Sequence, residues 1–150
     1  MRLYLDTSLL GAVLDRDDPR RVSVSRALLE DIARQRHVGV ISNVVEEELD
    51  QAPQGVREGI LAEIRAIELE LVVESEESGV LLSEYEALAV IPARYRNDLR
   101  HVAVASTGQV DALVSWNFRH IVNVRTRRAV HSVNLRLGYP LIEIVSPEEV

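Results

Sequence analysis

Short apolar segments alternate with longer helical ones along the whole chain. Five of them are typical of buried strands, at residues 2–5, 38–41, 69–73, 112–115 and 141–145. Caps and apolar spacing predict helices between them, at residues 8–14, 20–36, 43–50, 54–68, 76–90, 94–107 and 124–137. Strands that alternate with helices form a parallel sheet covered by helices on both faces. The 150 residues carry no repeat or linker, and they predict one domain, residues 1–150, of α/β class: three α/β/α layers around about five parallel strands.

The first expected strand runs directly into a carboxylate, in the segment Leu5-Asp6-Thr7-Ser8. Ligands of open α/β sheets bind beyond the carboxyl ends of the strands, so Asp6 is placed where a site is expected. An aspartate at this point is also an ordinary helix N-cap. A functional role for Asp6 therefore depends on further acids in matching places.

A second acid follows the second strand. Val44, Val45 and Leu49 define the apolar face of the next helix, and Glu48 falls inside that face, while the two preceding glutamates point away from it. A carboxylate turned toward the core needs a partner. No basic residue lies within one helical turn of Glu48, so a metal ion or a distant base must supply that partner.

The later part of the chain offers one more acid and one amide. Asp98 stands in the first turns of an alanine-rich helix, where an acid is as readily a first-turn residue as a functional one. Asn117 follows the fourth strand and lies at its carboxyl end. Asp111 begins the same strand, so we expect it far from the site, as a turn or cap residue.

The other polar and aromatic candidates have simpler interpretations. His101, His120 and His131 lie among helix-forming residues, which favours packed or surface histidines over ligands. Trp116 offers a ring on which a base can stack, but a buried ring that anchors its loop is the preferred interpretation.

The ordered set of these motifs resembles the PIN-domain family, which includes the ribonuclease toxins of bacterial VapBC toxin–antitoxin systems. The resemblance spans nearly the whole chain: Leu5-Asp6-Thr7-Ser8, Ser42 with Glu48-Leu49, Asp98 before its alanine-rich helix, and Ser115-Trp116-Asn117-Phe118. It implies a PIN-like fold and a metal-dependent endoribonuclease that hydrolyses RNA phosphodiester bonds. It also implies an antitoxin protein as a possible partner and a homodimer.

The resemblance assigns roles to individual residues. The first three acids of the family correspond to Asp6, Glu48 and Asp98, which would bind Mg²⁺ or Mn²⁺. The fourth acidic position falls on Asn117, a departure that brings an oxygen without negative charge and leaves one or two metal ions open. Thr7, Ser115 and Arg119 are the expected substrate-binding residues.

The composition agrees with such a site. Hard cations choose oxygen ligands, and the chain has no cysteine. The net charge of −7 is concentrated in residues 46–86, where 13 acids face two arginines, whereas residues 112–142 contain no acid and five arginines. These arginines either hold RNA phosphates or form a solvated helix face. No segment has the length of a membrane span and no signal precedes Asp6, so we expect a cytoplasmic protein.

Two alternative functions remain open, and one surface is expected to form a homodimer. A PIN-like module that binds RNA or protein with little or no catalysis is compatible with Asn117. A flavodoxin-like regulatory domain would need a lysine near its phosphoacceptor acids, and all 17 basic residues are arginine. An apolar row, Ile60, Ile64, Ile67 and Leu71, is the expected surface for a homodimer.

Overall fold

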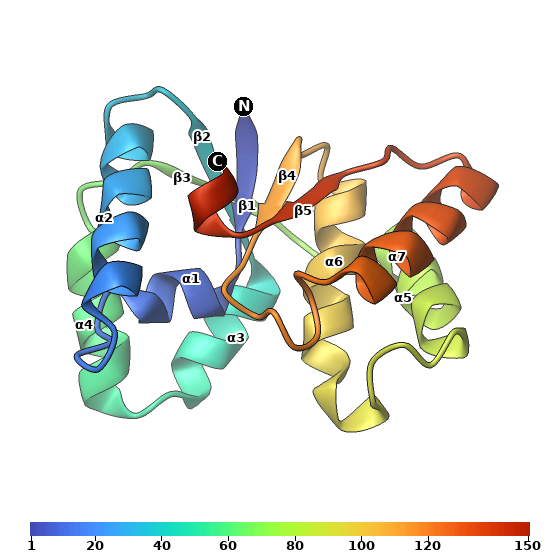
Figure 1. Cartoon of the computed structure of the whole chain (residues 1–150), viewed down its shortest axis with the longest axis horizontal. Coiled ribbons are helices and arrows are strands. Elements are labelled where there is room, and N and C mark those ends of the chain that lie inside the picture. Colours follow the sequence, from blue (N-terminus) through green and yellow to red (C-terminus); the bar gives the residue numbers. More distant parts are fainter.

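The computed structural model describes residues 1–150 and contains a five-stranded sheet. The strands are β1 (Arg2–Leu5), β2 (Val38–Ser42), β3 (Leu69–Val72), β4 (Ala112–Val114) and β5 (Glu143–Val145), in the order β3-β2-β1-β4-β5. All neighbours are parallel, and Tyr4 of the central strand pairs with Val40 on one side and Leu113 on the other. Their carboxyl ends therefore meet at one edge, which lies below the sheet in Figure 1. The parallel sheet expected from the sequence is confirmed.

Helices cover both faces of this sheet (Figure 1). The seven α-helices are α1 (Thr7–Ala12), α2 (Pro19–Ala33), α3 (Asn43–Gln51), α4 (Gln54–Ile64), α5 (Glu76–Ala87), α6 (Arg96–Thr107) and α7 (Val124–Leu137). Two 3₁₀ turns, η1 (Ala93–Tyr95) and η2 (Pro147–Glu149), complete the elements. The first four helices lie on one side of the sheet and the last three on the other. The expected three-layer α/β/α arrangement is confirmed.

The pleat of β1 divides the interior into two hydrophobic cores. Leu3 and Leu5 face the core beneath α1 to α4, whereas Tyr4 between them faces the core beneath α5 to α7. Alternate side chains of a strand point to opposite faces of the sheet, so one four-residue strand contributes to both cores. Tyr4 thus places a buried hydroxyl beside α6, which is buried along most of its length.

The helices differ from the predicted ranges at their ends. The helix predicted at residues 54–68 ends at Ile64, and the one predicted at residues 76–90 ends at Ala87. Ala89 has a left-handed φ of 49°, which does not continue a right-handed helix. The predicted segment 94–107 begins instead with the 3₁₀ turn η1 before α6.

The apolar row expected to form a dimer surface is largely used inside the chain. Ile60 is 1 % exposed, and Ile64 and Ile67 pack against the same core. Only Leu71, on the edge strand β3, is exposed, at 52 %. The row is therefore wrong as a continuous dimer surface, because Ile60, Ile64 and Ile67 face the core beneath α1 to α4 rather than solvent.

None of the helices is both long enough and apolar enough to cross a membrane.

Candidate active site

Asp6 lies at the junction between β1 and α1 and is 3 % exposed. Its Oδ1 accepts a hydrogen bond from the Leu9 backbone N–H at 3.0 Å, so it is the N-cap of α1. Ser115, at the end of β4, donates to its Oδ2 at 2.6 Å, and the Ser8 hydroxyl contacts both oxygens at 2.7 and 2.9 Å. Asp6 therefore serves as the N-cap of α1 and is also the candidate site residue.

The environment of Asp6 opposes its ionisation. Burial raises the pKa of the Asp6 carboxyl above its ordinary value, although the nearby His101 and the bonds from Ser115, Ser8 and Leu9 lower it in part. A buried carboxylate held mainly by neutral donors is costly in the ionised form. A counter-charge near Asp6 would relieve that cost.

Glu48 extends from α3 toward the same edge, and its side chain is 29 % exposed. Thr7, the residue after Asp6, donates to Glu48 Oε1 at 2.8 Å, and His101 Nε2 lies 2.5 Å from the same oxygen. Burial alone would raise the pKa of Glu48, but bonds from His101, Thr7 and Asn97 together lower it. Two acids of the site are therefore tuned in opposite directions, Asp6 toward the neutral form and Glu48 toward the ionised form.

The distant base that Glu48 requires is His101. His101 is 3 % exposed and projects from α6, and its Nδ1 lies 2.7 Å from the Tyr4 hydroxyl. The prediction of a packed histidine is correct for its burial, but sequence reasoning did not connect it with Glu48, 53 positions away. The unpartnered glutamate on an apolar helix face was the available signal.

Asp98 and Asn117 join the site through His120. Asp98 Oδ2 lies 2.8 Å from His120 Nδ1, and the His120 backbone N–H donates to Asn117 Oδ1 at 3.0 Å. The Asn117 backbone N–H donates in turn to Ser115 Oγ at 2.9 Å, and Ser115 donates to Asp6. A continuous chain of hydrogen bonds thus links the sequence candidates Asp6, Ser115, Asn117 and Asp98.

The donor set matches a hard cation in chemistry but is not gathered around one. Carboxylate oxygens are the ligands that Mg²⁺ and Mn²⁺ prefer. No group of three or more His, Cys, Asp or Glu side chains lies close enough together to hold a metal ion. Each acid is bonded to a neighbour instead, Glu48 to His101 and Asp98 to His120.

A second charged cluster borders the site on α6. Arg100 pairs with Glu47 at 2.9 Å and with Glu74 at 2.5 Å. Its guanidinium lowers the pKa of both carboxyls, and the two acids raise the pKa of Arg100. Glu47, which the sequence predicts to point away from the apolar face of its helix, is exposed but paired with Arg100.

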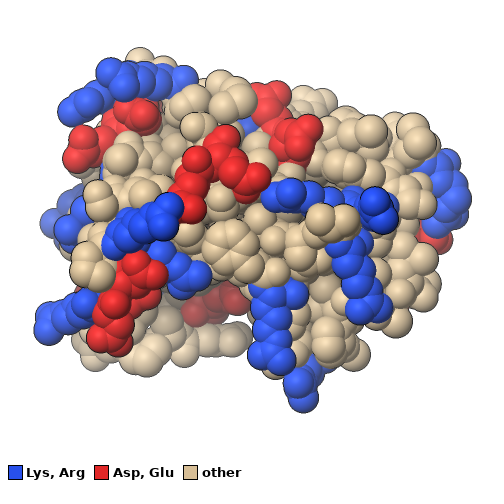
Figure 2. Space-filling view, in the orientation of Figure 1, with Lys and Arg blue, Asp and Glu red and all other residues tan.

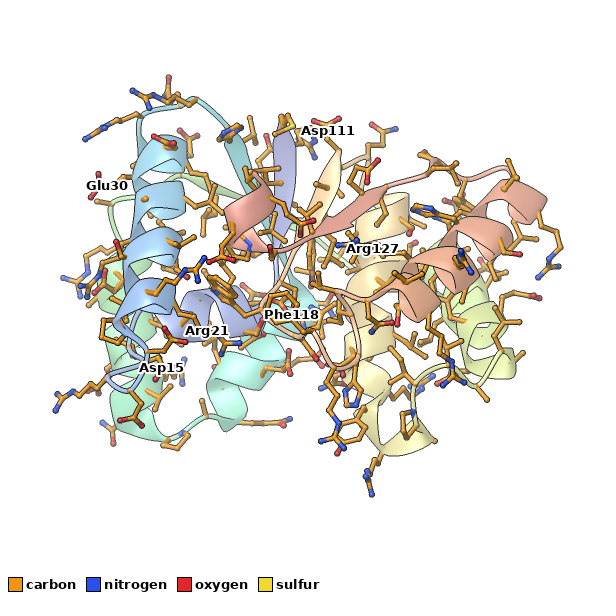
Figure 3. The ribbon with its side chains drawn as sticks, in the orientation of Figure 1. Asp15, Arg21, Glu30, Asp111, Phe118 and Arg127 are labelled. Carbon is orange, nitrogen blue, oxygen red and sulfur yellow. The ribbon has the colours of Figure 1, made fainter.

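An open cavity of about 360 Å³ is lined in part by Arg21, Trp116 and Ser8, whose hydroxyl binds Asp6. Trp116 is 6 % exposed and its Nε1 donates to Ser25 at 2.8 Å, so the preferred interpretation, a buried anchor, is confirmed. The Arg21 guanidinium lies 5.1 Å from the centre of the indole ring. Phe118, 47 % exposed, follows Asn117 at the lower edge of the sheet (Figure 3), and its ring centre lies 6.1 Å from that of Trp116. No signal in the sequence pointed to Arg21, and Phe118 was identified only as the last residue of the motif that begins at Ser115.

The remaining sequence candidates occupy two different regions. Arg119 is exposed on the loop after β4. The lower right of the face in Figure 2 carries arginine side chains with no acid among them. Asp111 lies at the opposite edge of the sheet, where its Oδ2 accepts the Arg2 backbone N–H at 2.7 Å (Figure 3). The prediction that Asp111 lies far from the site is confirmed.

Comparisons with known proteins identify the fold. No family model and no curated protein matches the chain. The chain is similar to a solved structure, the crystal structure of VapBC2 from Rickettsia felis bound to a DNA fragment from the VapBC2 promoter. The match has a TM-score of 0.60 and 17 % identity, and it covers 97 % of this chain and 98 % of that chain. The chain has a VapC-like fold. The likeness extends over the whole α/β/α arrangement, which is the PIN-like fold expected from the sequence.

Proposed function

We propose that this chain is a Mg²⁺- or Mn²⁺-dependent endoribonuclease, the toxin of a type II toxin–antitoxin pair. The observation that carries the proposal is the hydrogen-bond network at the carboxyl edge of the sheet. It links Asp6, Asn117 and Asp98 through Ser115 and His120, and it links Glu48 to His101 and to Thr7, the residue next to Asp6. The VapC-like fold supports the proposal.

Asp6, Glu48 and Asp98 would hold the cation. When bound, Mg²⁺ or Mn²⁺ supplies a Lewis acid for the phosphoryl oxygens and lowers the pKa of its bound water. Glu48, which its neighbours keep ionised, would orient the attacking water by accepting a hydrogen bond from it. Since Asn117 Oδ1 already accepts from His120, its amide N–H₂ is left to donate to a phosphate oxygen.

The RNA would approach along the cavity lined by Ser8, Arg21 and Trp116. Arg21, which lines the cavity, and exposed Arg119 would bind its phosphates, and exposed Phe118 offers an apolar ring at the same edge. Thr7 and Ser115 are the nearby hydroxyls, and each already holds a carboxylate. Arginine–phosphate contacts weaken as salt rises, so RNA affinity should fall steeply between low and physiological ionic strength.

An antitoxin and a second copy of the chain are the proposed partners. The similar structure is a VapBC2 complex, which supports an antitoxin partner. Self-association would have to use residues other than the buried Ile60 row. Leu71 in the edge strand β3 and Val73 directly after it are 52 % and 61 % exposed and are available for such contacts. Sedimentation that shows only monomer at micromolar concentration would contradict the dimer.

A binding module without nuclease activity is the second candidate. Asn117 in place of a fourth acid, and the absence of three metal-binding side chains in one group, favour it. Such a module would bind RNA or a protein through the same edge of the sheet and leave it intact.

The two candidates are separated by cleavage and thermal melting measured on the same proteins. Wild type should cut single-stranded RNA with Mn²⁺ and not with EDTA, and Mn²⁺ should raise its melting temperature. Asp98→Asn should abolish cleavage and keep the fold. Asp111→Asn, at the opposite edge of the sheet, is the control and should cut like wild type. A wild type that neither cuts RNA nor gains stability from Mn²⁺ leaves the binding module as the function.

A further inference from the structure

A line of buried polar groups runs from the core to Glu48. Ser42 Oγ lies 2.6 Å from the Tyr4 hydroxyl, which lies 2.7 Å from His101 Nδ1, and His101 Nε2 lies 2.5 Å from Glu48 Oε1. Ser42 and Tyr4 are fully buried, and His101 is nearly so. The three residues come from β2, β1 and α6, so only the folded chain assembles the line.

The donors and acceptors from Ser42 through Tyr4 and His101 to Glu48 can be assigned in one consistent direction. A carboxylate oxygen only accepts, so His101 Nε2 must carry a hydrogen at 2.5 Å from it. At the other end, the Val44 backbone N–H donates to Ser42 Oγ at 3.2 Å, which leaves the Ser42 hydroxyl free to donate to Tyr4. Tyr4 can then donate to Nδ1, so every group in the line is satisfied.

Packing does not require the polar groups in this line. Tyr4 lies in a core cluster dominated by apolar side chains, where phenylalanine would fill nearly the same volume without a hydroxyl to satisfy. Buried polar groups are tolerated when they are fully bonded, and such networks restrict the side chains they hold. The end of the line that reaches solvent is the carboxylate of the candidate site.

We propose that His101 is the positioning residue of this site, held by Tyr4 and Ser42 so that it fixes the Glu48 carboxylate. The inference rests on the proposed nuclease function. His101 and Thr7 both bind Oε1 of Glu48, so they fix the rotation of the carboxylate. Neither of them binds the other oxygen, Oε2. A long flexible side chain is thereby kept in one orientation before substrate arrives.

The chain contains a matched control for this line. Tyr85 is also a buried tyrosine, and its hydroxyl bonds Ser106 at 3.1 Å and Asn134 at 2.5 Å. That network ends on the Pro140 carbonyl, which Asn134 contacts at 2.9 Å, and includes no candidate site residue. Removing either hydroxyl should lower the melting temperature by a similar few degrees, but only Tyr4 should affect cleavage.

The test measures kcat and KM for Mn²⁺-dependent cleavage of single-stranded RNA, together with melting temperature. Tyr4→Phe should lower kcat about 10-fold with KM nearly unchanged, and His101→Ala about 100-fold, the range typical of residues that orient ligand side chains. Tyr85→Phe should keep wild-type kcat. His101→Gln should restore much of the activity lost in His101→Ala, because its amide N–H can reach Glu48. NMR of the metal-free protein should show a hydrogen-bonded Nε2–H on His101 that weakens in Tyr4→Phe and persists in Tyr85→Phe.

The outcomes distinguish the positioning role from the proposed function. A wild type that cuts no RNA overturns the nuclease and, with it, the positioning role. Wild-type cleavage with equal kcat in Tyr4→Phe and Tyr85→Phe overturns the positioning role alone. The same conclusion follows if His101→Gln is as inactive as His101→Ala and no hydrogen-bonded Nε2–H is observed.

Discussion

Replacing Asp6 by asparagine should stabilise the protein at neutral pH and abolish RNA cleavage. Burial raises the pKa of the Asp6 carboxyl above 3.8, its ordinary value, so the folded protein resists ionisation at this site. Asparagine keeps an oxygen for the Leu9 N–H and remains a good N-cap. Its amide hydrogens face the Ser8 and Ser115 hydroxyls, which can rotate to accept them.

The sign and size of the stability change follow from the raised pKa. Protonated Asp6 contributes stability below pH 3.8, and this contribution is lost as the pH rises through the higher pKa of the folded state. Each pKa unit between the folded and unfolded states costs the wild type about 1.4 kcal/mol at neutral pH, a cost that asparagine does not carry. For a chain of this size, one unit corresponds to a melting-temperature gain of about 3–6 °C.

Thermal melting of wild type and Asp6→Asn between pH 3 and pH 7, without metal, measures this effect. The variant should melt higher than wild type at pH 7, and the two should converge near pH 3. Asp17→Asn, which changes an exposed acid in the loop before α2, should shift the melting temperature little at any pH. Equal melting of Asp6→Asn and wild type at pH 7, or a gain that persists at pH 3, would refute the reasoning.

Three further changes test other parts of the structure. Gly138→Ala should destabilise by about 1 kcal/mol in chemical denaturation, because Gly138 ends α7 with a left-handed φ of 77°; Gly79→Ala, inside α5 with open space around it, should stabilise by ~0.5–1 kcal/mol. Arg100→Gln should lower the melting temperature at pH 7 but not near pH 2, because the lowered pKa of Glu74 contributes stability above pH 4.5 that is lost as the pH falls. Asn117→Asp should tighten Mn²⁺ binding, measured by calorimetry, and unchanged affinity would contradict a metal site at this edge.

The sheet and its edge were predictable from local signals. Short apolar runs between capped helices specify a parallel α/β sheet whatever packs on it, because backbone pairing and right-handed crossovers leave few other arrangements. The same logic placed Asp6 and Asn117 at the carboxyl ends of their strands and Asp111 at the other end. Trp116 was predictable as a buried anchor from its size and its place after a buried strand.

The helix ends and the apolar row were less predictable. Apolar periodicity continues past Ile64, but the chain turns there to enter β3, and this turn depends on contacts with another layer. Ile60 has the same sequence signature whether it packs against its own core or against a second copy. Only the placement of α4 against α1 and α2 decides that it is buried.

The sequence by itself determined the three-layer fold, the edge at which acids gather and the need of Glu48 for a distant partner. The tertiary structure alone decided what that partner is, since His101 lies 53 positions away on α6. It also decided that Asp98 pairs with His120 and that Tyr4 points its hydroxyl toward His101 rather than toward the other core. The physical reason is range: periodicity and capping depend on neighbouring residues, whereas a hydrogen bond between side chains on different elements exists only once both have packed on the sheet.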